Sequence, residues 1–311
     1  MFRFVLRRLL NVAPTLLGIS LVAFVVADWL PGDPIALKMG QRGDEATRER
    51  LRKEHGLDAS AAGRYWRFLV KLGHGDLGQS IQYEQPVLRI LAERFVPTLQ
   101  LAAGAIVFAV IGGVGAGLMS ARRPGSWVDV GWTGVALAGV SMPVFWLGMM
   151  LIVFVAAKVP WLPTSGYEPW SVRHFLLPWV TLGTVPLALI ARLTRASVME
   201  AMDRDWARVA RAKGLGEWAT LWRYGLRPAL IPVVTVVGGS FASLLSGAAL
   251  TETVFDIPGL GREVFSAIEG RDYPVVLGAV MWFALTFVLV NLAVDVSYVF
   301  IDPRVRLEGR S

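Results

Sequence analysis

The sequence contains no cysteine and only three histidines, and these absences remove several kinds of chemistry. Without cysteine there are no disulfides, no thiolate nucleophiles and no thiolate metal ligands. His55, His74 and His174 lie outside the long apolar runs, so we expect no histidine-based metal site. The chain also lacks a G-x-x-x-x-G-K-[ST] loop, the motif that cradles phosphates, so we do not expect it to hydrolyse ATP by itself.

Charged residues are scarce as well. They make up 18% of the chain, against about 25% in soluble domains, while hydrophobic residues make up 54%. This composition indicates an integral membrane protein. The formal charge of +7 fits cytoplasmic loops rich in Lys and Arg, because the basic residues cluster where the apolar runs end. We therefore do not expect nucleic-acid binding.

Uncharged runs long enough to cross a bilayer predict six transmembrane helices with both termini in the cytoplasm. The first follows Arg3, Arg7 and Arg8 and is too long for a signal peptide. The fourth is the shortest and contains Pro178 and Pro186, so we expect it to be bent, or extended by Arg192 snorkelling to the interface. The six runs are Leu9–Ala27, Pro97–Ala121, Gly131–Ala157, Phe175–Ala191, Pro228–Thr251 and Pro274–Val294.

The segment between the first two runs, Pro31–Val96, is predicted to lie outside the cell. It is basic, but segments this long are translocated largely regardless of charge. Thr47–His55 and Ala62–Leu72 have helical patterns, so the segment should be partly helical. The expected division is 1–30 (N-terminus and first helix), 31–94 (external segment), 95–300 (permeation core, with a cytoplasmic loop at 196–228) and 301–311 (cytoplasmic tail).

Small residues recur every four positions in the second and fifth runs. Such stripes allow close packing of helices in lipid. Packing within the chain is the simpler interpretation, and a subunit interface or a translocation path is the alternative. The residues are Ala105, Ala109, Gly113, Gly117 and Ala121 in the second run, and Gly239, Ser243 and Gly247 in the fifth.

Two other classes of membrane protein are disfavoured. A membrane serine hydrolase could be imagined around Ser141, but no histidine lies within a predicted span to act as its base. An ion-coupled transporter usually carries ionisable groups inside the membrane, whereas Asp28, Glu252 and Asp295 lie at helix ends. A transporter without its own energy source needs a partner that supplies one.

The stretch Asp205–Arg227 is a basic, polar island between two apolar runs. Trp206–Lys213 predicts a short amphipathic helix, with Val209, Ala210 and Lys213 on one face. Gly214 stands where a helix C-terminus favours positive φ. A second helical piece, Glu217–Tyr224, is expected before Pro228 opens the next run. This arrangement predicts a protruding cytoplasmic element that fits a cleft on a soluble partner.

Several motifs together resemble one family of membrane proteins. Val209–Gly214, followed by Tyr224–Arg227, resembles the EAA coupling loop of binding-protein-dependent ABC importer permeases. Arg208 and Arg227 depart from the general loop in the manner of its peptide-importer branch, while Tyr224 and Pro228 depart even from that branch. Further matching motifs are Pro31–Pro34, His74–Gly78, Ser141–Trp146, Leu250–Phe255, Pro258–Gly261 and Arg271–Pro274.

The chain is thereby identified as similar to the B-type permease subunit of dipeptide and oligopeptide importers. The resemblance implies an all-α, MetI-like type I ABC importer permease in a bacterial or archaeal cell (inner) membrane, and not an enzyme. It implies a homologous C-type permease, two ABC ATPases that bind ATP and Mg²⁺, an extracytoplasmic substrate-binding protein and a peptide as cargo. This chain itself would bind no cofactor. The same scaffold imports nickel or glutathione, which remain alternatives.

The resemblance also implies roles for particular residues. Contact with the ATPases is expected from Arg208, Val209, Ala210, Arg211, Ala212, Lys213, Gly214, Leu215, Leu226 and Arg227. The expected pathway lining is Ser141, Met142, Phe145, Ser243 and Ser246. An external gate, or a docking surface for the binding protein, is expected at Glu252, Phe255, Asp256, Arg271 and Asp272.

Overall fold

A computed structural model describes residues 2–29, 34–39, 44–54 and 56–301 of the protein, with side chains omitted at 2–12, 247 and 298–301. Pro31–Asp33, His55 and the predicted tail from residue 302 onward lie outside the described residues. The described residues form helices and loops, with one isolated bridge between Gln79 and Pro86. The all-α prediction is therefore confirmed.

Packing divides the chain into two compact units. Unit 1 comprises Met1–Thr98 and Pro258–Val288, and unit 2 comprises Leu99–Ile257 and Leu289–Ser311. Helices α5 (Val87–Arg122) and α14 (Tyr273–Ile301) contribute residues to both units. These units reflect packing, whereas the division predicted from the sequence reflects membrane topology, so the two describe different properties.

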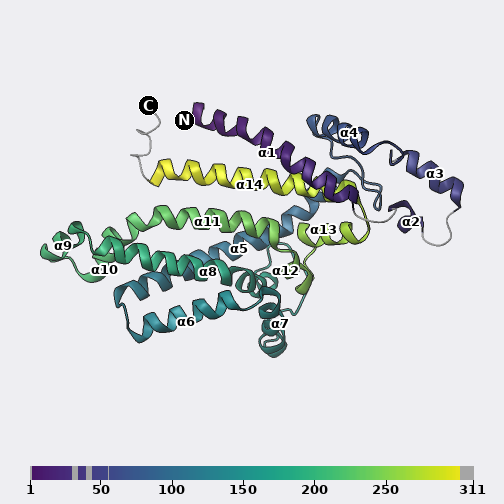
Figure 1. Ribbon diagram of the computed structural model, residues 1–311. Coiled ribbons are helices and arrows are strands. Elements are labelled where there is room, and N and C mark those ends of the chain that lie inside the picture. Colours follow the sequence, from purple (N-terminus) through teal and green to yellow (C-terminus); the bar gives the residue numbers. More distant parts are fainter. Residues whose placement is uncertain (1, 30–33, 40–43, 55, 302–311) are drawn as a thin grey trace. The chain divides into compact units, whose positions relative to one another are not determined.

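The N-terminal helices belong to unit 1, together with the first part of α5 (Figure 1). Helices α3 (Glu45–Glu54) and α4 (Ala61–Gly73) lie where the charged helical patterns of the external segment predicted them. The core of the unit contains Val87, Leu91, Leu260, Val275 and Ala279, all buried. The other elements of unit 1 are α1 (Phe2–Trp29), α2 (Pro34–Met39) and α13 (Leu260–Glu269).

Unit 2 holds most of the long apolar helices. Four helices of the described chain are long and apolar enough to cross a membrane, and a fifth crossing results if the bent pair α6–α7 counts as one. In α1, the apolar part with described side chains, Ala13–Trp29, is shorter. The elements of unit 2 are α6 (Trp127–Ser141), α7 (Val144–Phe154), η2 (Ala156–Lys158), α8 (Val172–Met202), α9 (Asp205–Ala212), α10 (Glu217–Thr220), η3 (Leu221–Leu226), α11 (Arg227–Gly247) and α12 (Ala249–Val254).

The small-residue stripe of α5 packs against α8. A Cβ atom added at Gly117 would lie 2.6 Å from the Ala191 carbonyl oxygen, and one at Gly113 would lie 2.8 Å from the Leu187 carbonyl oxygen. The two backbones therefore nearly touch, as small residues allow in lipid. The contacting residues follow the same order along both helices, with Gly113 near Leu187 and Gly117 near Ala191, so α5 and α8 run parallel. Two spans that run in the same direction must be joined by a segment that crosses the membrane in the opposite direction. The bent pair α6–α7 is therefore one broken span.

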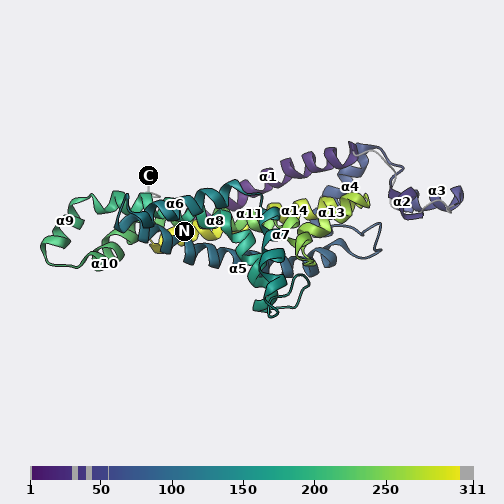
Figure 2. The same ribbon diagram turned by 90° about the horizontal axis from the view of Figure 1, so that it is seen from below.

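The third predicted span, Gly131–Ala157, is not one continuous helix. The helix ends at Ser141 and resumes at Val144, and the two halves are bent by 108°. Figure 2 shows α7 turning away from the direction of α6. Pro143 explains the break, because it has no N–H to continue the helix and forces the preceding residue into an extended conformation. Met142 indeed has φ −85° and ψ 135°.

The fourth and fifth spans also differ from their predicted bounds. Helix α8 runs from Val172 to Met202, well beyond the uncharged run, and contains both Pro178 and Pro186. The predicted second short piece, Glu217–Tyr224, is not a separate helix. It continues through η3 directly into α11, because Pro228 lies in the first turn of α11, where a missing N–H costs little.

Candidate functional site

Helix α9 lies at one end of unit 2, beyond the ends of α8 and α11 (Figures 1 and 2). It begins at Asp205, whose negative charge suits a helix N-terminus, and ends before Lys213. The prediction of a short helix stopped by Gly214 is confirmed, since Gly214 has φ +82°. The Leu215 N–H donates to the Ala210 carbonyl at 3.2 Å, which closes the left-handed helix end.

Two alanines attach α9 to the rest of unit 2. Ala207 and Ala210 are buried, and Ala207 belongs to a cluster with Val198 and Met202 of α8 and Leu221 of η3. Because alanine adds little bulk, the helix lies close against α8. In addition, Arg211 Nε lies 3.4 Å from Glu217 Oε1 and bridges the turn between α9 and α10. The element is therefore a packed structure, unlike an ordinary polar loop.

The outward face of α9 is apolar and basic. Trp206 and Val209 are about half exposed, at 47% and 51%. Val209 thus faces away from Ala210, and the predicted common face of Val209, Ala210 and Lys213 was wrong. Arg208, Arg211, Ala212, Lys213, Gly214 and Arg227 are also exposed, Leu215 is partly buried, and Ala210 and Leu226 are buried. Of the residues predicted to contact the ATPases, Ala210 and Leu226 are therefore too buried for direct contact with another protein.

The segment after α9 contains a π-helix, η3, with the wider i→i+5 hydrogen-bond pattern. Gly225 lies inside it, and a Cβ atom added there would lie 3.1 Å from Val198 Cγ1. Trp218 and Trp222 are exposed on this side, and the Arg122 guanidinium lies 4.9 Å from the centre of the Trp218 ring. Sequence reasoning missed both tryptophans, although large aromatic residues in a charged loop are themselves a signal of an interface.

The residues predicted to line a pathway lie at the broken span and on α11. Ser141 ends α6 and its hydroxyl donates to the Leu137 carbonyl at 2.8 Å. Met142 forms the break, and Phe145 is 40% exposed at the start of α7. Ser243 and Ser246 are exposed on α11. These five side chains therefore belong to unit 2, and all but the partly buried Met142 are exposed.

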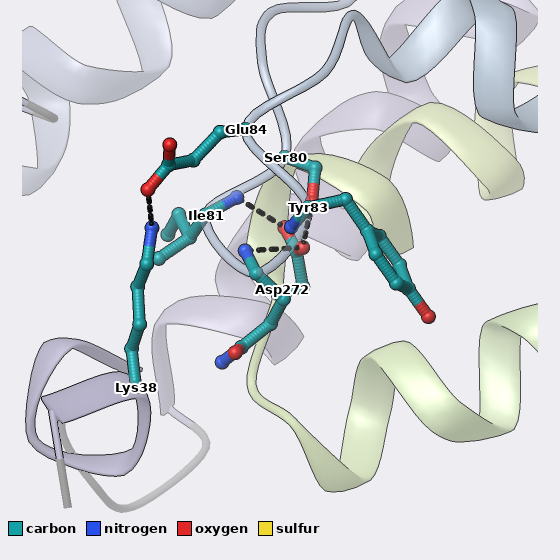
Figure 3. Close-up of polar contacts among 7 residues, drawn as sticks. Lys38, Ser80, Ile81, Tyr83, Glu84 and Asp272 are labelled. Carbon is teal, nitrogen blue, oxygen red and sulfur yellow. Dashed lines mark hydrogen bonds and ion pairs between the residues drawn. The ribbon is translucent and has the colours of Figure 1, made fainter.

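Asp272, predicted at a gate or docking surface, is instead a buried anchor of unit 1 (Figure 3). Its carboxylate accepts hydrogen bonds from the Ser80 hydroxyl and from the backbone N–H groups of Ile81 and Gln82, the latter two at 3.1 Å. Lys38 of α2 contacts Glu84 at 2.6 Å in the same loop. The segment 74–86 is therefore held in a defined conformation, with Tyr83 half exposed on it.

The other predicted docking residues divide between buried and exposed positions. Glu252 and Phe255 are buried in unit 2, where the Phe255 carbonyl accepts a hydrogen bond from the Gly166 N–H at 2.9 Å. Asp256 is exposed in unit 2 and Arg271 is partly exposed in unit 1. Both have positive φ, at 54° and 55°. Any protein contact at these positions therefore falls to Asp256 and Arg271.

A buried ion pair that sequence reasoning did not find joins α6 to α8. Asp129, with a side chain only 6% exposed, accepts hydrogen bonds from Arg195 Nε and Nη2 at 2.6 and 2.7 Å. The Gly125 N–H donates to the same carboxylate at 2.9 Å. Bidentate pairs of this kind fix geometry as well as charge. Arg195 lies two turns before the end of α8, so the pair sets the position of the helix that leads into α9.

The comparisons with known proteins agree on one family. Residues 113–307 match the family described as "Binding-protein-dependent transport system inner membrane component", and residues 1–102 match its N-terminal family. The chain is 41% identical over 306 residues to a protein from Escherichia coli (strain K12), covering 98% of this chain and 99% of that protein. It is 42% identical over 307 residues to a protein from Pectobacterium atrosepticum, with the same coverage. Both relatives are named "Glutathione transport system permease protein GsiC".

A solved structure of the MetNI methionine ABC transporter in inward-facing conformations has the same fold. The TM-score is 0.58 at 18% sequence identity, with 69% of this chain and 97% of that chain covered. The two family models, the near-complete relatives and the solved structure all indicate a helical inner-membrane permease fold. The chain belongs to the family of binding-protein-dependent transport system inner membrane components, the permeases of ABC importers.

Proposed function

We propose that this permease imports glutathione, with α9 transmitting the action of the ATPases to the membrane helices. The observation that supports this cargo is the sequence similarity to permeases named for glutathione transport, with over 40% identity along nearly the whole chain. This similarity favours glutathione, which was one of the alternatives, over di- and oligopeptides in general. Di- and oligopeptides were the cargo first expected from the coupling-loop motif. Glutathione is itself a tripeptide, so the motif and the relatives point to neighbouring chemistry.

The proposed complex contains this chain, a homologous permease, two cytoplasmic ATPases and an extracytoplasmic binding protein. An importer permease requires ATPase and binding-protein partners, and this sequence has no phosphate-binding loop of its own. Both termini are proposed to be cytoplasmic, on the side of α9. Exposed apolar residues such as Trp206 and Val209 surrounded by arginines suit a contact of this kind, because interfaces favour aromatic residues and arginine.

Movement of α9 would reach the translocation pathway through packed helices. Ala207 contacts the cluster shared with α8, and Arg195 of α8 holds Asp129 of α6. Helix α6 ends at the break formed by Met142 and Pro143. We place the pathway lining at Ser141, Met142, Phe145, Ser243 and Ser246, with alternating access as the transport cycle. Asp256 and Arg271 are the residues that we assign to contact with the binding protein.

Cargo can be tested in vesicles that contain the complete importer. We expect ATP-dependent, saturable uptake of labelled glutathione in the presence of its binding protein. An unlabelled dipeptide or nickel ions in excess should leave this uptake largely unchanged. Vesicles that lack this chain, or lack ATP, are the controls. Faster uptake of dipeptide or nickel than of glutathione would contradict the proposed cargo while leaving the importer function intact.

Gly214→Val should separate ATP hydrolysis from uptake. No neighbouring atom lies within 4 Å of a Cβ atom at Gly214, so the variant meets no clash. A β-branched residue at φ +82° is strained, by about 1–2 kcal/mol, and should redirect the chain after α9. We expect glutathione uptake to fall at least about tenfold while the complex still forms and hydrolyses ATP.

Gly216→Val is the matched control for this variant. Gly216 also has open space around it, but its φ is −63°, which any residue adopts. We expect Gly216→Val to retain most uptake. Normal uptake by Gly214→Val, or an equal loss in both variants, would count against a coupling role for the left-handed helix end.

A further inference from the structure

Unit 1 contains a cavity of about 420 Å³ that no step of transport described above uses. Its volume lies in the range of small-molecule sites. Its apolar lining includes Phe24 of α1, Phe68 of α4 and Leu277 of α14. The charged side chains line the remaining walls: Arg64, Arg67 and Lys71 from α4, and Asp28, Glu54 and Asp76 from three other segments.

The cations of the cavity come from one face of one helix. Arg64, Arg67 and Lys71 are spaced three and four residues apart, so they project to the same side of α4. Asp28 pairs with Arg64, yet Arg64 Nε remains buried with no hydrogen-bond partner among the described residues. A buried donor of this kind costs free energy until an acceptor meets it. This wall of the cavity is therefore prepared for an anion.

Carboxylates line other walls of the same cavity. Glu54 ends α3, and Asp76 lies at the start of the anchored segment 74–86, where its Oδ1 accepts a hydrogen bond from the Gly78 N–H at 2.8 Å. The lining thus presents cations from one helix and carboxylates from separate segments. A ligand that carries both an anion and an ammonium group fits this distribution better than a simple anion.

The cavity lies where α1 leaves its apolar stretch. Leu17, Leu21 and Val22 of α1 are exposed, and Trp29 at its end is 81% exposed. Aromatic residues favour this position at membrane interfaces. Helix α4 packs on the same end of α1, with the Phe24 and Tyr65 ring centroids 5.2 Å apart, and it exposes Trp66 and Val70. An amphipathic helix with apolar and basic faces at this level is typical of the lipid head-group region.

We propose that the cavity binds the head group of a zwitterionic phospholipid, phosphatidylethanolamine. Arg67 and Lys71 contact the phosphate, and Arg64 Nε donates the hydrogen bond that the protein itself leaves open. Glu54 and Asp76 receive the ammonium group. The acyl chains lie over the exposed leucines and valine of α1. The bound lipid thereby ties the external segment to α1 at the surface of the bilayer.

The test is direct binding to the complete importer, purified and stripped of lipid by detergent exchange. The probe is dihexanoylphosphatidylethanolamine, titrated by calorimetry. We expect Arg67→Gln/Lys71→Gln to weaken its binding at least about tenfold, as expected when charged hydrogen bonds to a phosphate are lost. Arg50→Gln, an exposed arginine of α3 outside the cavity, should bind like the unaltered protein.

Further experiments identify the ligand and distinguish a lipid from soluble molecules. Glu54→Gln should weaken binding of the ethanolamine lipid but not of dihexanoylphosphatidylglycerol, which has no ammonium group. If the double variant does not fold, Lys71→Gln alone serves, because Lys71 is exposed. Equal binding by the variants and the unaltered protein would overturn the proposal. Binding of glutathione or inorganic phosphate at this site in preference to the lipid would overturn it as well.

Discussion

Asp129→Asn should lower the stability of the permease by about 3 kcal/mol, the lower end of the range for breaking a buried ion pair. The variant leaves the Arg195 charge without its carboxylate in a site where Asp129 is almost fully buried. The lower end applies because the Arg195 side chain is 33% exposed, so water can screen part of its charge. We expect a lower melting temperature of the purified importer and a matching loss of glutathione uptake.

A double variant distinguishes the charge from the packing at this position. Replacing a buried pair with apolar residues of similar size is often neutral or stabilising. We therefore expect Asp129→Leu/Arg195→Met to recover the melting temperature, with uptake returning as well, because the pair acts as a fixed strut between α6 and α8. Recovery of stability without uptake would contradict the strut and assign the charges a role in the transport cycle.

Gly117→Val should be the most damaging change in the stripe between α5 and α8. Its Cβ would lie 2.6 Å from both the Ala191 carbonyl oxygen and Thr194 Cβ. Backbone atoms cannot rotate away as a side chain can, so α8 must shift. We expect a loss of about 3 kcal/mol, the upper part of the range for overpacking, and loss of uptake because α8 carries α9. Thermal unfolding of the purified importer measures the first effect and vesicle uptake the second.

Gly115→Val is the control in the same helix. No atom lies within 4 Å of a Cβ atom at Gly115, so the same substitution meets open space two residues earlier. Valine also has a better helix propensity than glycine. We expect little change in melting temperature or uptake. Equal damage from Gly115→Val and Gly117→Val would show that bulk in α5 itself, and not its contact with α8, accounts for the loss.

Local signals in the sequence predicted the parts of this structure that depend on local physics. Gly214 marked the end of α9, and the charged patterns marked α3 and α4. Helix ends and amphipathic faces depend on residues that are close together in the sequence. The stripe from Ala105 to Ala121 predicted close helix packing, although it did not identify α8 as the neighbour. An apolar run or a glycine therefore predicts local structure without knowledge of its distant contacts.

Features that depend on distant residues could not be predicted in this way. Nothing near Arg195 in the sequence indicates its partner Asp129, 66 residues away. The break at Met142–Pro143 lies in a run without charge, so hydropathy alone described one span. The family resemblance placed Asp272 at a gate or docking surface, yet three donors from residues 80–82 hold it inside.

The anchor at Asp272 has a consequence for the order in which the protein is made. Its carboxylate joins the chain 192 residues after the Ser80 hydroxyl that it binds. At about 5–20 residues per second, the ribosome needs roughly 10–40 s to cover that distance. During this interval the segment 74–86 has been synthesised without its three hydrogen bonds from Asp272. The packing of unit 1 can therefore be completed only when the final span is being synthesised. A chain truncated before Asp272 would leave this segment without its anchor.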